Sequence, residues 1–455
     1  MINLFENYRE EEKDLESSLQ QAGYKHQTIV LNEDGYLPEH VTSPISFFTG
    51  MKEDNSSKND SPKFFNEISL PNYWEIKGDG QKAEIFEGYK KRGHINYSQR
   101  KTDYRAVKSV EWLNDSGRVR AIDLYNQYGT LFGREAYSDG QRTLTTYFDK
   151  KQAEVILINH ITQTIQLNYK KKQYVFETYT DFIIFYLEES KSNTREIFYN
   201  SLGRPFFITE ALKAKKPNKA YNHTLFWQEE SAEIPGNMRM ILSDKAAPTK
   251  RIVIQNREEY IRIQQQINEQ TSVQIEYLGY LYNLRARKSI NKSILILTNS
   301  DQIAQLNQLL DALPNYQFNI AARTTMSQKL HAFENYSNVQ LYPTVDDLEL
   351  EKLISKSSFY LDINHGNEVE HIIRTAFENN QLILGFNETI HNKRYTSAEN
   401  IFHQNEWMNL VQRIREVGKN FKAYRKALGS QWWSSGQSTI DDYKEVLKWK
   451  IKIPF

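Results

Sequence analysis

The sequence predicts an α/β protein with two parallel, doubly wound units and an antiparallel β-meander inserted in the first. Short buried strands alternate with helical segments at the start of the chain and again from about residue 180. Between residues 64 and 178, turn signals recur roughly every dozen residues, with alternating side chains between them. The length of 455 residues also exceeds one ordinary core, because a domain holds about 150 residues.

The first α/β unit is expected over residues 1–63 and 179–249. Residues 6–21 form an acidic amphipathic pattern with Leu15 and Leu19 on one face, and Gly23 is a typical helix stop. Residues 28–31 form a short apolar strand. The polar stretch over 52–61 predicts an exposed loop.

The meander is expected over residues 64–178. Its turn signals include Asp-Ser-Gly, Tyr-Gly and Asp-Gly sequences, at 115–117, 128–129 and 139–140. Tyr and Thr are frequent between the turns, as on half-buried pleated surfaces. The basic stretch 90–108 contains interleaved tyrosines, and it predicts a solvated sheet face or a partner surface rather than a nucleic-acid site.

The second α/β unit is expected over residues 250–428. Its predicted strands are 251–254, 293–297, 318–321, 339–341, 359–362 and 382–386, with helices between them and a last helix over 407–428. The tail, 429–455, mixes lysines with apolar residues. We expect it either to pack back on the first unit, since Trp449 and its isoleucines are costly to expose, or to contact an anionic membrane surface peripherally.

Composition excludes several classes of function. Lys and Arg total 58 against 57 for Asp and Glu, so no overall field attracts nucleic acid. The chain has no cysteine, which excludes disulfides, thiolate nucleophiles and cysteine-based zinc sites. The acidic start is unlike a signal peptide, and no apolar run approaches the ~20 residues of a spanning helix. We therefore expect a cytoplasmic protein.

Two such units in tandem are typical of the GT-B glycosyltransferase architecture. However, the residues that bind the sugar donor in that architecture are not evident in this sequence. There is no dinucleotide, P-loop, Asp-x-Asp or His-Glu-x-x-His motif, so no cofactor or metal is expected. Asp301 lies in the segment after the 294–297 strand, where a retaining enzyme carries cations for the diphosphate. Glu370 and Glu378 have the Glu-x7-Glu spacing, yet they are displaced by about one helical turn. A non-catalytic chain is favoured, and an active retaining transferase that uses a UDP-sugar is the alternative.

Four residues are candidate contacts for a polypeptide in the cleft of such a fold. Asp362, Asn364 and His365 follow a predicted strand, at the sheet edge where ligands bind. The alternative is that Asp362 and Asn364 only cap the next helix. Trp227 has the stacking face that a peptide or sugar requires, although such a residue more often lies in the core.

Long sequence blocks give the chain a specific resemblance. They are Phe64–Asn66, Tyr73–Ile76, Val107–Leu113, Phe198–Leu202, Leu225–Glu229, Pro235–Met238, Asp301–Ile303, Tyr360–Gly366 and Ala376–Asn380. The similarity that rests on them covers nearly the whole chain, which resembles the GtfB-type glycosyltransferase-stabilising proteins of the accessory Sec system.

The resemblance implies a non-catalytic subunit of a protein-glycosylation complex. Its implied partner is a GtfA-type O-GlcNAc transferase, which binds UDP-GlcNAc, in a two-plus-two heterotetramer with the meanders in the interface. The implied acceptor is a serine-rich-repeat adhesin polypeptide, which is glycosylated in the cytoplasm before export. A peripheral contact of this chain with the cell membrane is left as an alternative. A third alternative is a secreted sugar-binding or wall-binding module built on residues 64–178.

Overall fold

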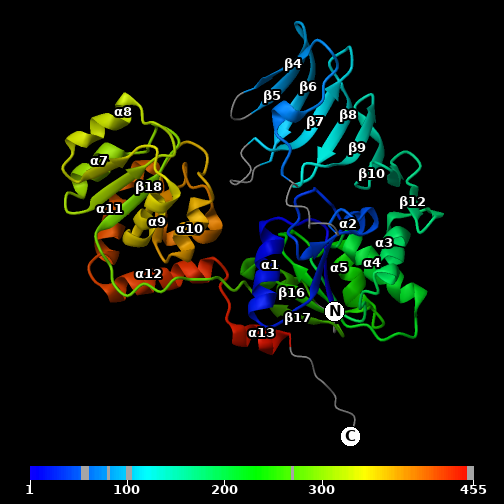
Figure 1. Ribbon diagram of the computed structural model, residues 1–455. Helices are drawn as coiled ribbons and strands as arrows, with labels where there is room; N and C mark the ends of the chain where they lie inside the picture. Colours follow the sequence, from blue (N-terminus) through cyan, green and yellow to red (C-terminus); the bar gives the residue numbers. More distant parts are fainter. Residues whose placement is uncertain (53–60, 79–81, 99–104, 268–270, 448–455) are drawn as a thin grey trace. The chain divides into compact units, whose positions relative to one another are not determined.

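The computed structural model describes residues 1–52, 61–78, 82–98, 105–267 and 271–447. It contains two compact units, Met1–Tyr277 and Leu278–Phe455 (Figure 1). Each unit has its own parallel sheet, and the first also carries a large antiparallel sheet. The protein is therefore of the mixed α/β class.

The first parallel sheet has seven strands in the order β17-β16-β15-β14-β1-β2-β3. Their bounds are β1 Ile2–Phe5, β2 Gln27–Val30, β3 Val41–Thr42, β14 Ile197–Tyr199, β15 His223–Trp227, β16 Thr249–Ile254 and β17 Gln274–Tyr277. The unit's helices are α1 Glu10–Gln21, α2 Pro44–Thr49, α3 Tyr179–Glu189, α4 Arg204–Lys215, α5 Gly236–Ser243 and α6 Arg257–Gln266. The strand order changes direction between β1 and β14, and ligands bind at such points in open α/β sheets.

The expected boundary between the two α/β units, at residues 249–250, is wrong. Strand β16 pairs in parallel with β15, with Leu225 opposite Ile252, so it belongs to the first sheet. Strand β17 then pairs with β16 and ends the unit at Tyr277. Strand–helix alternation looks the same in either unit, and it does not specify which sheet a strand joins.

The antiparallel sheet has ten strands, each paired with its neighbours in the sequence, as predicted for a meander. They are β4 Trp74–Gly78, β5 Ala83–Glu87, β6 Lys90–Tyr97, β7 Val107–Leu113, β8 Val119–Tyr125, β9 Leu131–Ser138, β10 Gln141–Phe148, β11 Glu154–Asn159, β12 Ile165–Tyr169 and β13 Lys172–Phe176. Of these strands, β4 and β13 lie at the two edges.

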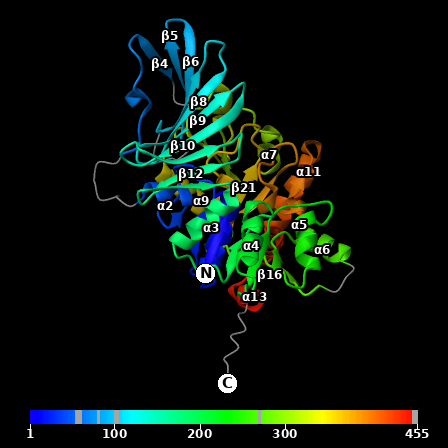
Figure 2. The ribbon, with the colours of Figure 1, turned by 90° about the vertical axis from the view of Figure 1, so that its right-hand side faces the viewer.

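One end of this sheet shares a core with the α/β part of the first unit. Ile156 of β11 and Leu167 of β12 are fully buried in one cluster with Phe48 of α2 and Phe182 of α3. Helices α2 and α3 lie beside β12 in both views of the ribbon (Figures 1 and 2). The other end has a smaller cluster of its own around Ile85 and Val110.

The second unit has a six-stranded parallel sheet in the order β20-β19-β18-β21-β22-β23. The strands are β18 Ser293–Leu297, β19 Gln317–Ala321, β20 Val339–Tyr342, β21 Phe359–Asp362, β22 Leu382–Phe386 and β23 Ile401–Phe402. The helices are α7 Leu306–Ala312, α8 Gln328–His331, α9 Asp347–Lys356, α10 Ile372–Glu378, α11 Trp407–Val417, α12 Phe421–Ser434 and α13 Ile440–Val446.

The described part of the C-terminal tail packs within the second unit. The Tyr443 hydroxyl of α13 donates to the Gly279 carbonyl at 2.7 Å, and the Tyr280 N–H donates to the Gly436 carbonyl at 2.8 Å. Trp449 and the isoleucines on which both tail hypotheses depend lie outside the described residues. Among the helices that are described, none is both long and apolar enough to cross a bilayer.

Candidate functional site

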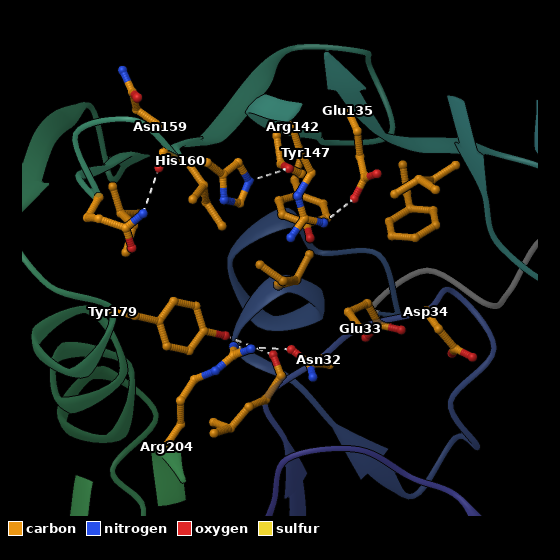
Figure 3. A pocket seen from close by; sticks show the side chains of 18 of the residues that line it. Asn32, Glu33, Asp34, Glu135, Arg142, Tyr147, Asn159, His160, Tyr179 and Arg204 are labelled. Atoms are coloured by element: carbon orange, nitrogen blue, oxygen red, sulfur yellow. Dashed lines mark hydrogen bonds and ion pairs between the residues drawn. The ribbon is translucent and has the colours of Figure 1, made fainter. Parts of the chain in front are cut away.

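The antiparallel sheet covers a pocket of about 840 Å³ in the first unit and forms its roof. Figure 3 shows the roof side chains facing a floor that is formed at the carboxyl end of β2 and at the starts of α3 and α4. Its lining includes Leu31, Asn32, Glu33, Asp34, Lys108, Phe132, Glu135, Arg142, Thr145, Tyr147, His160, Glu177, Tyr179 and Arg204. The pocket thus combines a parallel-sheet edge with the inserted sheet.

The floor is held in place by Arg204, the first residue of α4. Its Nη1 donates to Asn32 Oδ1 at 3.2 Å, and its Nε lies 3.1 Å from Glu6 Oε1. The guanidinium also lies 4.8 Å from the centroid of the Tyr179 ring, a cation–π distance. The Tyr179 hydroxyl donates to the Leu31 carbonyl at 2.9 Å. These contacts tie the starts of two helices to the strand edge.

The roof is built from side chains of β9, β10 and the turn after β11. Arg142 Nη1 lies 2.6 Å from Glu135 Oε1, and Thr145 Oγ1 is within 2.8 Å of His160 Nε2. Burial, with a smaller contribution from Arg142, lowers the pKa of His160, so its ring is neutral near pH 7. Within the described residues, the Tyr147 hydroxyl has no hydrogen-bond partner.

Most charged groups of the pocket are paired or buried. Lys108 Nζ lies 3.4 Å from Asp34 Oδ2. The Glu33 carboxyl accepts hydrogen bonds from Ser43 Oγ at 2.6 Å and from the Gly35 N–H at 2.9 Å, while burial raises its pKa. Glu177 is the exception, because it is exposed and has no cation beside it among the described residues. Chemically, the described lining therefore presents aromatic faces, hydrogen-bonding groups and no unpaired cation.

In the second unit, Asp362 braces a loop. It is 2% exposed and accepts two hydrogen bonds from His391, at 2.7 Å from the backbone N–H and at 2.5 Å from Nδ1. The His391 Nε2 donates to the Gly366 carbonyl at 2.6 Å, so both ring nitrogens carry protons. The hydrogen bond to Asp362 raises the pKa of His391 to about 9. The bracing hydrogen bonds and the burial of Asp362 disfavour a ligand contact, which stays a prediction.

Asn364 has a similar bracing role. It is 3% exposed, and its Oδ1 accepts from Thr298 Oγ1 at 2.8 Å and from the Gly366 N–H at 3.0 Å. Its Nδ2 donates to Asn299 Oδ1 at 3.2 Å. The loop conformation leaves no space for a side chain at position 366, where a Cβ would lie 1.9 Å from the Asn299 Oδ1. Asn364 therefore braces the loop and does not cap α10, whose N-cap is His371, and its contact with a polypeptide stays a prediction.

The remaining two candidates lie in different units. His365 is exposed and lines a small pocket of about 420 Å³ with Lys329, Phe333 and Gln404, so its contact with a polypeptide stays a prediction. Trp227 is 3% exposed in the core of the first unit, and its Nε1 donates to Glu259 Oε1 at 3.3 Å. Its position is that of a core residue, and its burial disfavours the expected contact, which stays a prediction.

The two glutamates with donor-site spacing are each held by an arginine. Glu370 precedes α10 in a left-handed backbone conformation, with φ of 52°, and lies 2.6 Å from Arg323 Nη2. Glu378 is the last residue of α10 and lies 3.0 Å from Arg374 Nε. They do not share a helix face, because only Glu378 lies in α10.

Sequence reasoning missed the pocket residues. Arg142, Tyr147 and His160 lie on the meander, whereas Tyr179 and Arg204 lie beyond it, and no motif links them. The only signals available were the abundant tyrosines of the meander and the Pro205 that follows Arg204, typical of a helix start.

The fold and the pocket define a mixed α/β protein with an inserted ten-stranded sheet and a binding pocket beneath it. Family models for three GtfB domains match residues 2–48 (N-terminal), 74–177 (middle) and 179–266 (third). A model described as the GftB/GlyA-F C-terminal domain matches residues 294–431.

Similar proteins extend over the whole chain. The UDP-N-acetylglucosamine–peptide N-acetylglucosaminyltransferase stabilizing protein GtfB of Streptococcus agalactiae is 37% identical over 98% of this chain and 99% of its own. Its Streptococcus pneumoniae counterpart is 35% identical over the same shares. A chain in the crystal structure of a GtfA/B complex bound to UDP and GlcNAc is 36% identical, with a TM-score of 0.90 and coverage of 98% and 99%. The protein belongs to the GtfB family of transferase-stabilising proteins.

These findings confirm the family resemblance found in the sequence. The relatives are named as proteins that stabilise the transferase and not as the transferase itself, in agreement with the predicted non-catalytic subunit. Pneumococcal GtfA has a TM-score of 0.53 at 11% identity over 98% of this chain and 99% of its own, so it shares the fold alone.

Proposed function

We propose that this chain binds and stabilises a GtfA-type peptide N-acetylglucosaminyltransferase and also binds the serine-rich-repeat acceptor of that enzyme. The observation that carries the proposal is the 36% identity and TM-score of 0.90 to a chain of a GtfA/B complex. In this proposal the units are arranged as in GT-B enzymes, and two copies of each subunit form the complex. Glycosylation precedes accessory Sec export and takes place in the cytoplasm.

Donor binding is assigned to the partner in this proposal. In this chain Glu370 and Glu378 are neutralised by Arg323 and Arg374, and Asp301 follows β18 with Lys329 Nζ 4.0 Å away. Carboxylates engaged in this way are poor partners for a sugar and a ribose. Saturable binding of UDP-GlcNAc to the isolated chain would count against this division of roles.

The ten-stranded sheet is the proposed surface for the transferase. Ala121, Ala136 and Leu144 lie directly opposite one another across β8, β9 and β10 and are only half-buried. At the β13 edge, Val175 is 62% exposed. A flat, uncharged strip of this kind suits packing against a second sheet, at a spacing of about 10 Å. Because pneumococcal GtfA shares the fold over nearly its whole length, a GtfA-type partner supplies a comparable sheet.

Leu144→Arg tests this surface. A buried, unpaired guanidinium in the interface should abolish co-purification with the transferase when the two chains are co-expressed. Glycosylation of a Ser/Thr-rich acceptor in the same cells should fall with it. Leu348→Arg is the matched control, because Leu348 is 63% exposed on α9. Retention of the complex by Leu144→Arg, with normal folding, would show that this strip is not the interface.

A further inference from the structure

We propose that the pocket beneath the ten-stranded sheet is where the acceptor polypeptide binds, and that it selects extended segments without acidic side chains. This inference rests on the proposed function and specifies the site and the chemical class of its ligand. It follows from three features of the pocket: paired cations, aromatic faces and available hydrogen-bonding groups.

Charge pairing sets the selectivity. Three cations line the described pocket, and Lys108, Arg142 and Arg204 each lie within 3.4 Å of a carboxylate oxygen. An acidic ligand side chain that enters the pocket loses water without gaining an uncommitted cation, which is unfavourable. Glu177, which is exposed and has no cation beside it in the described structure, adds to this effect. A neutral side chain avoids this cost. The pocket thus discriminates against acidic side chains.

The lining also matches a neutral polypeptide in its contact chemistry. The rings of Phe132 and Tyr147 stack with centroids 6.2 Å apart, and Tyr179 presents a third aromatic ring from the floor. Such rings pack against Cα atoms and methyl groups. The Tyr147 hydroxyl, together with the neutral His160 and Thr145 pair, provides donors and acceptors for peptide groups or for serine and threonine hydroxyls.

The size and position of the pocket agree with a chain segment. Its volume of about 840 Å³ lies within the range of ligand pockets, ~300–1,000 Å³. The floor lies at the carboxyl edge of a parallel sheet, next to the change in strand order, where ligands of open α/β folds bind. Small hydroxyl-bearing residues in an extended segment fill such a space without bringing charge.

Glu135→Gln tests the selectivity as a gain of function. The Glu135 carboxyl also accepts from the Tyr137 hydroxyl at 2.8 Å, and glutamine keeps a hydrogen-bonding group of the same shape while it leaves the Arg142 charge uncompensated. The purified complex with the transferase is titrated with a labelled Ser/Thr/Ala peptide and with a version that carries Asp at alternate positions. The wild type should bind the Asp peptide at least about tenfold more weakly. Glu135→Gln should tighten binding of the Asp peptide about tenfold, relative to the neutral one.

Two further variants test whether the peptide binds in this pocket. Tyr147→Phe keeps the ring and removes the hydroxyl, so it should weaken the neutral peptide about fivefold and leave co-purification intact. Glu154→Gln, on an exposed residue of β11 outside the pocket, should change neither affinity nor selectivity.

The possible results separate this inference from the function on which it rests. If the wild type binds the neutral peptide but Glu135→Gln and Tyr147→Phe behave like Glu154→Gln, the pocket is not the site, although the proposed function stands. Equal wild-type affinity for the neutral and the Asp peptide would overturn the selectivity. If the wild-type complex binds none of the peptides, the acceptor-binding half of the proposed function fails, and this inference fails with it.

Discussion

His391 shows how a single residue fixes the edge of the second parallel sheet. Its two ring N–H groups connect Asp362, at the end of β21, with the Gly366 carbonyl in the following loop. Asp362 is buried, so its carboxylate favours a protonated ring beside it. The charged pair therefore holds together the loop whose residues the sequence suggested as contacts for a polypeptide.

The pH dependence of unfolding tests this pair. Because the pKa of His391 is raised to about 9 from an unfolded value of ~6.5, the pair contributes fully below pH 6.5. The contribution is then lost as the pH rises toward 9. We expect the free energy of unfolding of His391→Gln to be lower than that of wild type by about 2 kcal/mol at pH 6, with most of this difference gone at pH 9.5. Denaturant unfolding at both pH values measures this, and a constant difference would exclude the charged pair.

At the scale of elements, the inserted sheet is only partly a separate module. Strands β11 and β12 share buried side chains with α2 and α3, whereas the strands near β5 and β7 have their own cluster. Removing residues 64–178 would expose Phe48 and Phe182, so the α/β part is not expected to remain soluble without the sheet.

Ile156→Ala tests the shared core. Ile156 is fully buried between the sheet and the helices, so truncation should lower the free energy of unfolding by about 2–4 kcal/mol. Hydrogen exchange should then increase in α3 as well as in β10–β12, since both sides lose packing. Ile161→Ala is the matched control, because Ile161 is 74% exposed in the turn after β11, and it should change stability by less than about 0.5 kcal/mol. Increased exchange confined to the sheet would contradict a shared core.

At the scale of the whole molecule, the chain divides after Tyr277 into two units with separate cores. The first unit contains its complete seven-stranded sheet, the ten-stranded sheet and the pocket. The regions proposed to bind the transferase and the acceptor therefore belong to one unit.

A fragment of residues 1–277 tests this division. We expect it to be soluble, to unfold cooperatively and to co-purify with the transferase, because its sheets and core are complete. Circular dichroism during thermal unfolding and co-expression with the transferase measure the two properties. A matched fragment of residues 1–249, the boundary suggested by the sequence, lacks β17 and most of β16 and should be aggregated. Equal behaviour of the two fragments would contradict the observed boundary.

Sequence patterns by themselves determined the local structure and the family. Turn signals between 64 and 178 predicted an antiparallel meander, and strand–helix alternation predicted the parallel sheets, because both patterns depend on residues close together in the chain. Long blocks such as Val107–Leu113 were sufficient to indicate the family, since they are specific to it.

Only the tertiary structure decided which distant segments meet. It placed β16 in the first sheet, buried Trp227 against Glu259, and used Asp362 and Asn364 to brace a loop. It also brought Arg142 and Tyr147 over the Arg204 floor (Figure 3). A local pattern shows that a residue is buried or follows a strand, but not what it packs against. Which strands pair and which side chains become buried depends on contacts between segments far apart in the chain. The pocket is formed by such long-range contacts.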